Sequence, residues 1–231
     1  MGGHIDCYID IASFYGYLAF VYLRKQRESL AAHNVNVEFH PIFLGGINVG
    51  SGNQPPWTLP AKAKYGKFDM IRSRSYHGGL NIEPPSFFPP LTLLPQRALT
   101  FIKSAYPSEV FEKTFLLLFQ KLWTPPNQID VTKPDLLKGV LLESKLYSNE
   151  QVEEIMGKAV DKFWKDLLLE NTGKVLKLGA FGAPWMWVRN DKGEEEPFFG
   201  SDRFHFMWEY LGLPWQDIEI LPPKDDTKSK L

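Results

Sequence analysis

The chain has 231 residues, of which 44% are hydrophobic and 23% charged, and its 26 basic and 27 acidic side chains nearly cancel. This length and balance are typical of a folded protein with a sizeable core, and they give no electrostatic footprint for nucleic acid. The single cysteine, Cys7, excludes an internal disulfide and a multi-cysteine metal centre, and no apolar run reaches the ~18 residues that a membrane span needs.

The amino-terminal part predicts a strand, a helix and a second strand. Residues 5–9 alternate apolar and polar side chains, and residues 35–43 do so again, as half-buried strands do. Between them, apolar side chains recur at helical spacing from Phe14 to about residue 29, with Ser13 where an N-cap would stand. This order predicts a βαβ unit with parallel strands.

The middle of the chain predicts short helices separated by prolines, because proline cannot continue a helix interior. Residues 44–60 are rich in Gly, Asn, Ser and Pro, which predicts a loop. No strand is expected in residues 61–170. Helical periodicity appears in six stretches, at 61–76, 95–105, 108–122, 133–144, 149–158 and 159–170.

The carboxy-terminal part predicts a β-hairpin and a last helix. Strands at 185–188 and 196–200 flank a turn at 190–193, and the helix begins at Ser201-Asp202 and runs to about Leu211. Without the six helical stretches, this is the order of an α/β thioredoxin fold. We therefore expect a thioredoxin fold (βαβ…αββα) interrupted by an all-helical insertion. The expected domains are a discontinuous thioredoxin-like domain, 1–55 and 171–231, and a helical domain, 56–170.

Five separated pieces of sequence, in a consistent order across residues 5–215, resemble one known family. They are Asp10-Ile11-Ala12-Ser13-Phe14-Tyr15-Gly16-Tyr17-Leu18, Ser51-Gly52-Asn53-Gln54-Pro55-Pro56, Leu91-Thr92-Leu93-Leu94-Pro95-Gln96-Arg97-Ala98-Leu99, Gly179-Ala180-Phe181-Gly182-Ala183-Pro184 and Phe199-Gly200-Ser201-Asp202-Arg203. The chain resembles the kappa-class glutathione transferases, which are related to the 2-hydroxychromene-2-carboxylate isomerases. Both belong to the DsbA-like branch of the thioredoxin superfamily.

Ser13 stands where thioredoxin-like oxidoreductases carry the first cysteine of Cys-x-x-Cys. Ser13-Phe14-Tyr15-Gly16 contains no sulfur, so the protein has no reagent there for dithiol exchange. From the residues alone, Ser13 is an N-cap. The resemblance implies more, namely that Ser13 holds the sulfur of glutathione as a thiolate at a helix N-terminus, which favours anions. The family usually has Pro and Ser at the positions of Phe14 and Gly16.

The resemblance also implies contacts with the peptide part of glutathione. A cis bond at Ala183-Pro184 would leave the main-chain N–H and C=O of Ala183 free to pair with the cysteinyl unit, whereas X-Pro bonds are ordinarily trans. Ser201 and Asp202 would hold the γ-glutamyl end, although capping a helix is a sufficient role for both.

The remaining implied contacts lie after the second strand. Asn53 would contact glutathione, and Lys62 would approach the glycyl carboxylate, with Lys64 as a neighbouring candidate. A loop asparagine is more often a turn former and a lysine more often solvated. The electrophilic substrate would lie in an apolar pocket lined by Phe14, Tyr15 and Trp57, residue types that otherwise fill cores.

These features predict an enzyme that conjugates electrophiles, or reduces peroxides, with glutathione as co-substrate. The first alternative is a glutathione-dependent isomerase of the 2-hydroxychromene-2-carboxylate type, and the second is a non-catalytic thioredoxin-like binding or chaperone module. No metal is expected, since the five histidines show no metal-ligand spacing along the chain. The resemblance implies a homodimer, and no nucleic-acid or membrane partner is expected.

The chain ends in Ser229-Lys230-Leu231, which is the tripeptide that the peroxisomal import receptor reads at a free C-terminus. It predicts a peroxisomal protein, with the cytosol as a second location. A solvated lysine-rich tail is the plain alternative.

Overall fold

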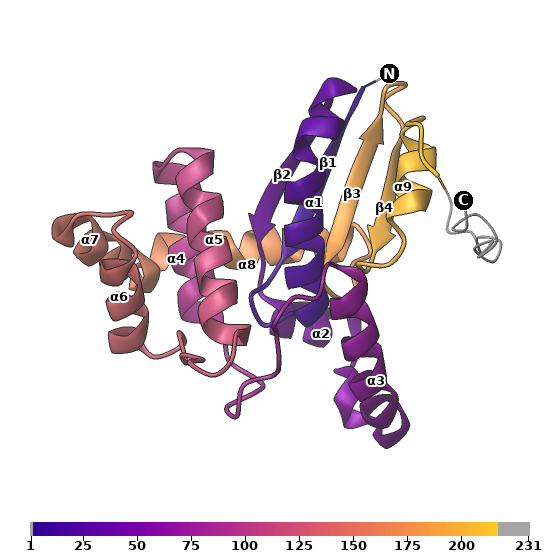
Figure 1. Cartoon of the computed structure of the whole chain (residues 1–231). Coiled ribbons are helices and arrows are strands. Elements are labelled where there is room, and N and C mark those ends of the chain that lie inside the picture. The colour runs from indigo at the N-terminus through magenta and orange to yellow at the C-terminus, as the bar shows by residue number, and fades with distance from the viewer. Residues whose placement is uncertain (1, 217–231) are drawn as a thin grey trace, which may run out of the picture.

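The computed structural model describes residues 2–216, which form a four-stranded mixed sheet with helices on both faces (Figure 1). The strands are β1 (Gly3–Ile9), β2 (Val35–Pro41), β3 (Trp185–Asn190) and β4 (Glu195–Phe199). They lie in the order β2-β1-β3-β4, with β1 parallel to β2, antiparallel to β3, and β3 antiparallel to β4. The α/β thioredoxin architecture predicted from the sequence is confirmed.

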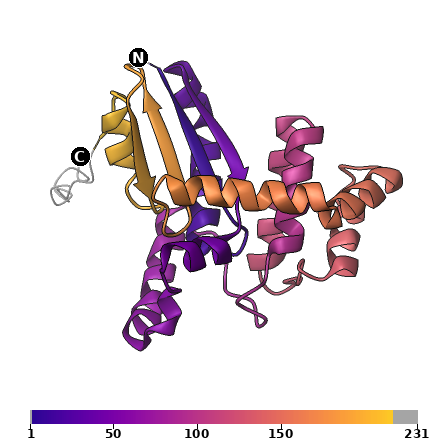
Figure 2. The ribbon, with the colours of Figure 1, turned by 180° about the vertical axis from the view of Figure 1, so that it is seen from behind.

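Helices cover the two faces of this sheet. On one face lie α1 (Phe14–Ala32) and α9 (Phe204–Tyr210), and on the other α2 (Leu44–Ser51) and α8 (Lys162–Lys177). In Figure 2, which shows the molecule from behind, α8 lies in front of the sheet. Successive side chains of a strand point to opposite faces. Cys7 and Ile9 of β1 therefore join the core beneath α1, whereas Tyr8 joins the smaller core beneath α2 and α8.

A group of helices lies beside the sheet and packs on α1. Its members are α4 (Leu93–Ala105), α5 (Ser108–Trp123), α6 (Pro134–Glu143) and α7 (Asn149–Val160) (Figure 1). The ring of Tyr17 in α1 stacks on that of Phe119 in α5, with the centroids 4.6 Å apart. The buried Gln96 of α4 donates through Nε2 to the carbonyls of Ile9 and Ile42, at 3.0 and 2.6 Å. These contacts fix the helical group to the end of β1 from which Ser13 follows.

The prediction of a loop at residues 44–60 is wrong, because this segment contains α2 and the 3-10 helix η1 (Pro56–Thr58). Glycine disfavours helices, but here tertiary contacts decide. The main-chain N–H of Leu44 donates to Asp10 at 2.8 Å. A Cβ atom on Gly50 would lie 2.5 Å from a methyl carbon of Leu176, so the glycine allows α2 to approach α8.

Two other predicted boundaries are wrong. The last helix begins at Phe204 and not at Ser201-Asp202, because the Ser201 carbonyl accepts a hydrogen bond from His77 instead of starting the helical ladder. The helix expected at 159–170 runs from Lys162 to Lys177, with Asp161 ending α7 and capping α8. The predicted domain division between residues 170 and 171 thus falls inside α8, which contacts α4 and α7 as well as α2 and β2.

One helix, α3 (Pro60–Tyr76), projects away from the sheet and buries none of its residues (Figure 1). It begins after η1, and Pro60 stands in its first turn, where a missing N–H costs little. Within residues 2–216, no helix combines the length and the apolarity required to cross a membrane.

Candidate active site

Ser13 lies at the N-terminus of α1 and faces the loop before β3. It has extended backbone angles, and its Oγ accepts a hydrogen bond from the N–H of Gly16 at 2.9 Å, so it is the N-cap of α1 as predicted. The same Oγ donates to the carbonyl of Ala183, also at 2.9 Å. Both residues are buried. The hydroxyl therefore joins two segments that are 170 residues apart in the chain.

The Ala183–Pro184 peptide bond is cis, as the resemblance implied. The prediction that the Ala183 carbonyl is free is wrong, because this carbonyl accepts a hydrogen bond from Ser13. The carbonyl of Pro184 accepts from Gly200 at 3.2 Å, which ties this loop to the segment carrying Ser201 and Asp202. The cis-proline loop and the Ser201-Asp202 segment, both predicted to contact glutathione, are thereby connected.

The three predicted pocket residues are linked by aromatic contacts. The ring of Trp57 lies 4.9 Å from that of Phe88, Phe88 lies 5.6 Å from Trp123, and Trp123 lies 5.7 Å from Phe14. Phe14 in turn packs edge-on against Tyr15 at 5.3 Å. Phe14 is buried and Trp57 is 43% exposed, so the series leads from the protein interior beside Ser13 to the surface.

Phe88 and Trp123 were missed from the sequence because each belongs to a segment far from Ser13. Trp123 ends α5, and its indole N–H donates to the carbonyl of Ile11 at 2.7 Å. The only signal in the sequence was the general abundance of aromatic residues, with 7 Trp and 17 Phe, and abundance does not identify members of a site.

Acidic groups surround Tyr15. Its hydroxyl donates to Asp69 of α3, which also accepts from Tyr65 at 3.2 Å. Burial raises the pKa of Tyr15, and the hydrogen bond to Asp69 and the charges of Asp69 and Asp202 raise it further. Tyr15 therefore stays a neutral hydrogen-bond donor at physiological pH. Asp69 had no recognisable signal in the sequence.

Ser201 and Asp202 lie before α9 and close to the end of α3. Ser201 is buried and its carbonyl lies 3.0 Å from Nε2 of His77, whereas Asp202 is exposed and lies 3.8 Å from Nε of Arg203. Both line a cavity of about 80 Å³. The other residues around it are Tyr22, Tyr76, Phe204, His205, Trp208, Trp215 and Gln216.

Asn53 contacts the loop before β3, whereas the two candidate lysines contact nothing specific. The Asn53 side chain donates through Nδ2 to the carbonyl of Phe181 at 2.6 Å, two residues before Ala183. Its Oδ1 accepts from the N–H of Gln54, as in the turn-forming role. Lys62 and Lys64 are exposed in the first turns of α3, and neither forms an ion pair within residues 2–216.

Asp10 lies beneath Ser13, where β1 gives way to the turn into α1. Its two carboxylate oxygens accept three hydrogen bonds, from Ala12 N, Leu44 N and Thr92 Oγ1, at 2.8 to 2.9 Å. Burial raises the pKa of Asp10 to about 6, against the opposing effect of these bonds. Asp10 thus holds the turn before α1, α2 and the segment before α4 together.

The single cysteine lies in β1 and is fully buried. Burial raises the pKa of the Cys7 thiol, and the charge of Asp6 raises it further. A protonated, inaccessible thiol neither attacks substrates nor exchanges disulfides. A reactive sulfur at this site must therefore come with a ligand.

Comparison with known proteins identifies the family and the fold of the chain. A family model described as a DSBA-like thioredoxin domain matches residues 4–212. The chain is 31% identical over 217 residues to glutathione S-transferase kappa 1 of Caenorhabditis elegans, covering 91% of each protein. It is 29% identical over 224 residues to glutathione S-transferase kappa 1 of Homo sapiens, covering 95% of this chain and 94% of the relative.

Solved structures show the same fold. A 2-hydroxychromene-2-carboxylate isomerase superposes with a TM-score of 0.73 at 19% identity, covering 90% of this chain and 94% of the other. The cytosolic disulfide reductase DsbM from Pseudomonas aeruginosa with GSH superposes with a TM-score of 0.58 at 12% identity, covering 91% of this chain and 100% of the other.

Proposed function

The chain belongs to the kappa-class glutathione transferases and carries a DSBA-like thioredoxin domain; from this we propose that it binds glutathione with the sulfur at the N-terminus of α1, where Ser13 stabilises the thiolate. The observation that carries the proposal is the hydrogen bond from Ser13 Oγ to Ala183. It brings the helix N-terminus and the cis-proline loop within reach of one ligand.

The hydroxyl of Ser13 is suited to donate to a thiolate. The Ser13 oxygen accepts a hydrogen bond from the N–H of Gly16, so the hydroxyl proton is available to a separate acceptor. In this structure that acceptor is the carbonyl oxygen of Ala183. A cysteinyl N–H of glutathione that pairs with the Ala183 carbonyl would compete for this oxygen and release the Ser13 proton toward the sulfur. The first N–H groups of α1 and the helix dipole favour the anion as well.

The proposed chemistry is nucleophilic. The thiol of bound glutathione loses its proton to solvent, and the thiolate attacks an electrophilic carbon, forming a C–S bond while the leaving group departs with the bonding electrons. With a peroxide, two glutathione molecules supply two electrons, giving glutathione disulfide, an alcohol and water. Catalysis then depends on thiolate stabilisation and on positioning of the two substrates.

We propose that the peptide part of glutathione runs along the cis-proline loop, past Ala183 and Pro184. The bond from Asn53 to Phe181 supports a place for Asn53 beside this loop. Ser201 and Asp202, tied to the same loop through Gly200, would hold the γ-glutamyl end. The exposed Lys62, or alternatively Lys64 two residues further along α3, would reach the glycyl carboxylate.

We propose that the electrophile lies against Phe14, Tyr15 and Trp57. The ring contacts through Phe88 and Trp123 make this an extended apolar wall beside Ser13. Such a wall would favour flat or aromatic electrophiles, because aromatic rings stack in offset or edge-on geometry.

The test replaces Ser13 by Ala and follows both thiolate absorbance and conjugation of a chlorodinitrobenzene-type substrate. We expect a higher pKa of the bound thiol and a fall in kcat of about a hundredfold to a thousandfold, the range of a lost transition-state donor. Ser148→Ala is the matched control, because Ser148 caps α7 in the same way but lies in the helical group. Each variant loses a helix N-cap, but only Ser13→Ala should reduce the thiolate absorbance of bound glutathione.

Thiolate absorbance and turnover that are unchanged in Ser13→Ala would contradict the role of Ser13. Counting thiols during turnover separates the transferase from the isomerase, in which glutathione adds and leaves without being consumed. Product formation with no loss of thiol would therefore identify an isomerase.

We propose that Ser229-Lys230-Leu231 directs the protein to peroxisomes through the import receptor; these residues lie outside the described part of the chain. A fluorescent protein fused to the amino end, with and without deletion of Leu231, tests this. Fluorescence should move from peroxisomes to the cytosol on deletion. An unchanged distribution would contradict the proposal.

A further inference from the structure

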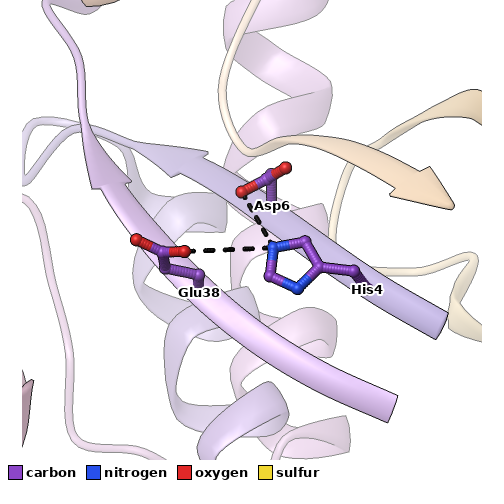
Figure 3. Close-up of side chains that lie close together, drawn as sticks. All are labelled: His4, Asp6 and Glu38. Atoms are coloured by element: carbon purple, nitrogen blue, oxygen red, sulfur yellow. Dashed lines mark hydrogen bonds and ion pairs between the residues drawn. The ribbon is translucent and has the colours of Figure 1, made fainter.

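Four ionisable side chains gather on the face of the sheet opposite α1, away from the candidate active site. His4 and Asp6 stand two residues apart on β1, and Glu38 and His40 stand two residues apart on β2. A strand repeats its side-chain direction every second residue. Because Asp6 pairs with Glu38 in the parallel register, all four side chains lie on one face. Figure 3 shows His4, Asp6 and Glu38 pointing toward one another.

The geometry points to a site for one divalent transition-metal ion, with His4, Asp6 and Glu38 as its ligands. Nε2 of His4 lies 3.1 Å from Oδ1 of Asp6 and 3.9 Å from Oε2 of Glu38, and the three ligand atoms lie within 4.8 Å of one another. A tetrahedral Zn²⁺ with bonds of about 2.1 Å separates its ligand atoms by about 3.4 Å. The observed separations lie on either side of that value, so small side-chain rotations complete the site.

Neighbouring groups orient the two carboxylates for this role. Nζ of Lys103 lies 2.6 Å from Oε1 of Glu38 and 2.6 Å from the carbonyl of Phe39, which holds Oε1 and turns Oε2 toward His4. Nε2 of His40 lies 2.6 Å from Oδ1 of Asp6. Hydrogen bonds of this kind to metal-binding carboxylates commonly fix the ligands of protein metal sites.

The chemistry of the ligands selects the class of ion. One imidazole nitrogen and two carboxylate oxygens suit Zn²⁺ and its neighbours such as Co²⁺, whereas Ca²⁺ and Mg²⁺ prefer oxygen ligands alone. The side chains of His4 and Asp6 are 24% and 23% exposed, so solvent can reach the fourth position. The bound ion would cross-link β1 to β2.

The expectation of no metal rested on the spacing of the five histidines along the chain, and this spacing does not reveal a cluster of one histidine and two carboxylates. The ligands come from two strands that are joined only by the sheet register, with α1 between them in the chain. The proposal concerns the face of the sheet away from Ser13 and is independent of the proposed glutathione chemistry.

The test uses the full chain, freed of metal with a chelator, and titrates it with Zn²⁺ by calorimetry and with Co²⁺ by visible absorption. We expect one ion per chain, the absorption bands of tetrahedral Co²⁺, and a Zn²⁺-dependent rise in Tm. Glu38→Gln and His4→Gln should each weaken Zn²⁺ binding more than tenfold and remove the rise in Tm, while circular dichroism reports that the variants fold.

Glu153→Gln is the matched control, since Glu153 also pairs with a lysine, Lys138, but lies on α7 and not on the sheet. It should leave Zn²⁺ binding unchanged. Absence of Zn²⁺ binding in the original chain would overturn the proposal and leave the cluster as an ion-pair network. Equal binding by the chain and by Glu38→Gln and His4→Gln would overturn it too, because the ion would then lie elsewhere.

Discussion

At the scale of single residues, Asp10 couples the stability of the active-site turn to pH. It is fully buried, and its carboxylate accepts from three groups in separate segments. Burial raises its pKa from 3.8 to about 6. Between these two values the folded chain holds a proton that the unfolded chain has lost, so this group's contribution to the free energy of unfolding falls as pH rises through that window.

We predict that Asp10→Asn removes this fall, so that between pH 4 and pH 6 the free energy of unfolding decreases less, or rises more, with pH than in the original chain. A shift of about two pKa units corresponds to about 3 kcal/mol across the window in the original chain. The amide cannot accept all three hydrogen bonds, so the variant should also be less stable than the original at pH 4. Denaturant unfolding at several pH values measures both effects.

The exposed Asp135 provides the control for this prediction. Asp135→Asn makes the same chemical change on the surface of α6 and should preserve the slope of the original chain. If Asp10→Asn preserved it as well, then the titration of Asp10 would not be the source of the pH dependence.

How much of the site can be predicted from sequence depends on where each partner stands in the chain. The capping role of Ser13 was predictable from its place directly before a helical stretch, and the cis bond at Ala183–Pro184 was predictable from the family resemblance. The hydrogen bond between them was not predicted, because it requires the β1–β3 pairing that brings the two turns together. Asp69 and Trp123 were missed for the same reason, since their roles arise only from packing of α3 and α5.

At the scale of elements, the first turn of α1 contains a glycine, Gly16, at the point where it approaches Ser13. A Cβ atom on Gly16 would lie 2.9 Å from Cβ and 3.1 Å from Oγ of Ser13, so any larger residue must displace the serine. Gly66 in the middle of α3 has no atom within 4 Å of the same position. The two glycines therefore separate the effect of crowding from the effect of helix propensity.

We predict that Gly66→Ala raises the stability by about 1 kcal/mol, because alanine favours a helix interior over glycine. Gly16→Ala should instead lower conjugation activity by about tenfold, since shifts of a fraction of an ångström at reacting groups already cost rate. Thermal unfolding and steady-state kinetics of both variants provide the measurement. Full activity in Gly16→Ala would show that Ser13 tolerates displacement.

Several of the well-predicted elements have a periodicity that is set by one buried face, although α3 was predicted to within one residue and buries none of its residues. The strands β1 and β2 and the helices α4 and α5 fall within a few residues of their predicted bounds. The helix α2 was missed because its glycines serve close packing on α8, a contact that local propensity does not contain. The break at Asp161 was misplaced because apolar periodicity continues through both helices.

At the scale of the whole molecule, α3 buries none of its residues within the described part of the chain, residues 2–216. Its exposed apolar side chains include Tyr65, Phe68, Ile71 and Tyr76, each more than half exposed. It contacts the remainder of the described chain through Arg74, which bonds to Ile82 and Glu83, and through Met70, which packs against the main core. Two further contacts, Tyr15–Asp69 and, just after the helix, His77–Ser201, adjoin the candidate site. We propose that α3 packs against a second copy of the chain, forming the expected homodimer next to the glutathione site.

We predict that the double variant Phe68→Ser, Ile71→Ser converts a dimer into a monomer, as measured by light scattering of the protein in solution. The change removes two large apolar side chains, each 55% exposed, from one side of α3.

The control is Phe163→Ser, Leu169→Ser on α8, which removes an aromatic and an aliphatic side chain that are 61% and 52% exposed. The control should remain dimeric. A monomeric original chain would refute the homodimer, and dissociation of the control alone would move the interface from α3 to α8. Because α3 carries Asp69 and both candidate lysines, the monomeric variant should also have a higher KM for glutathione than the control.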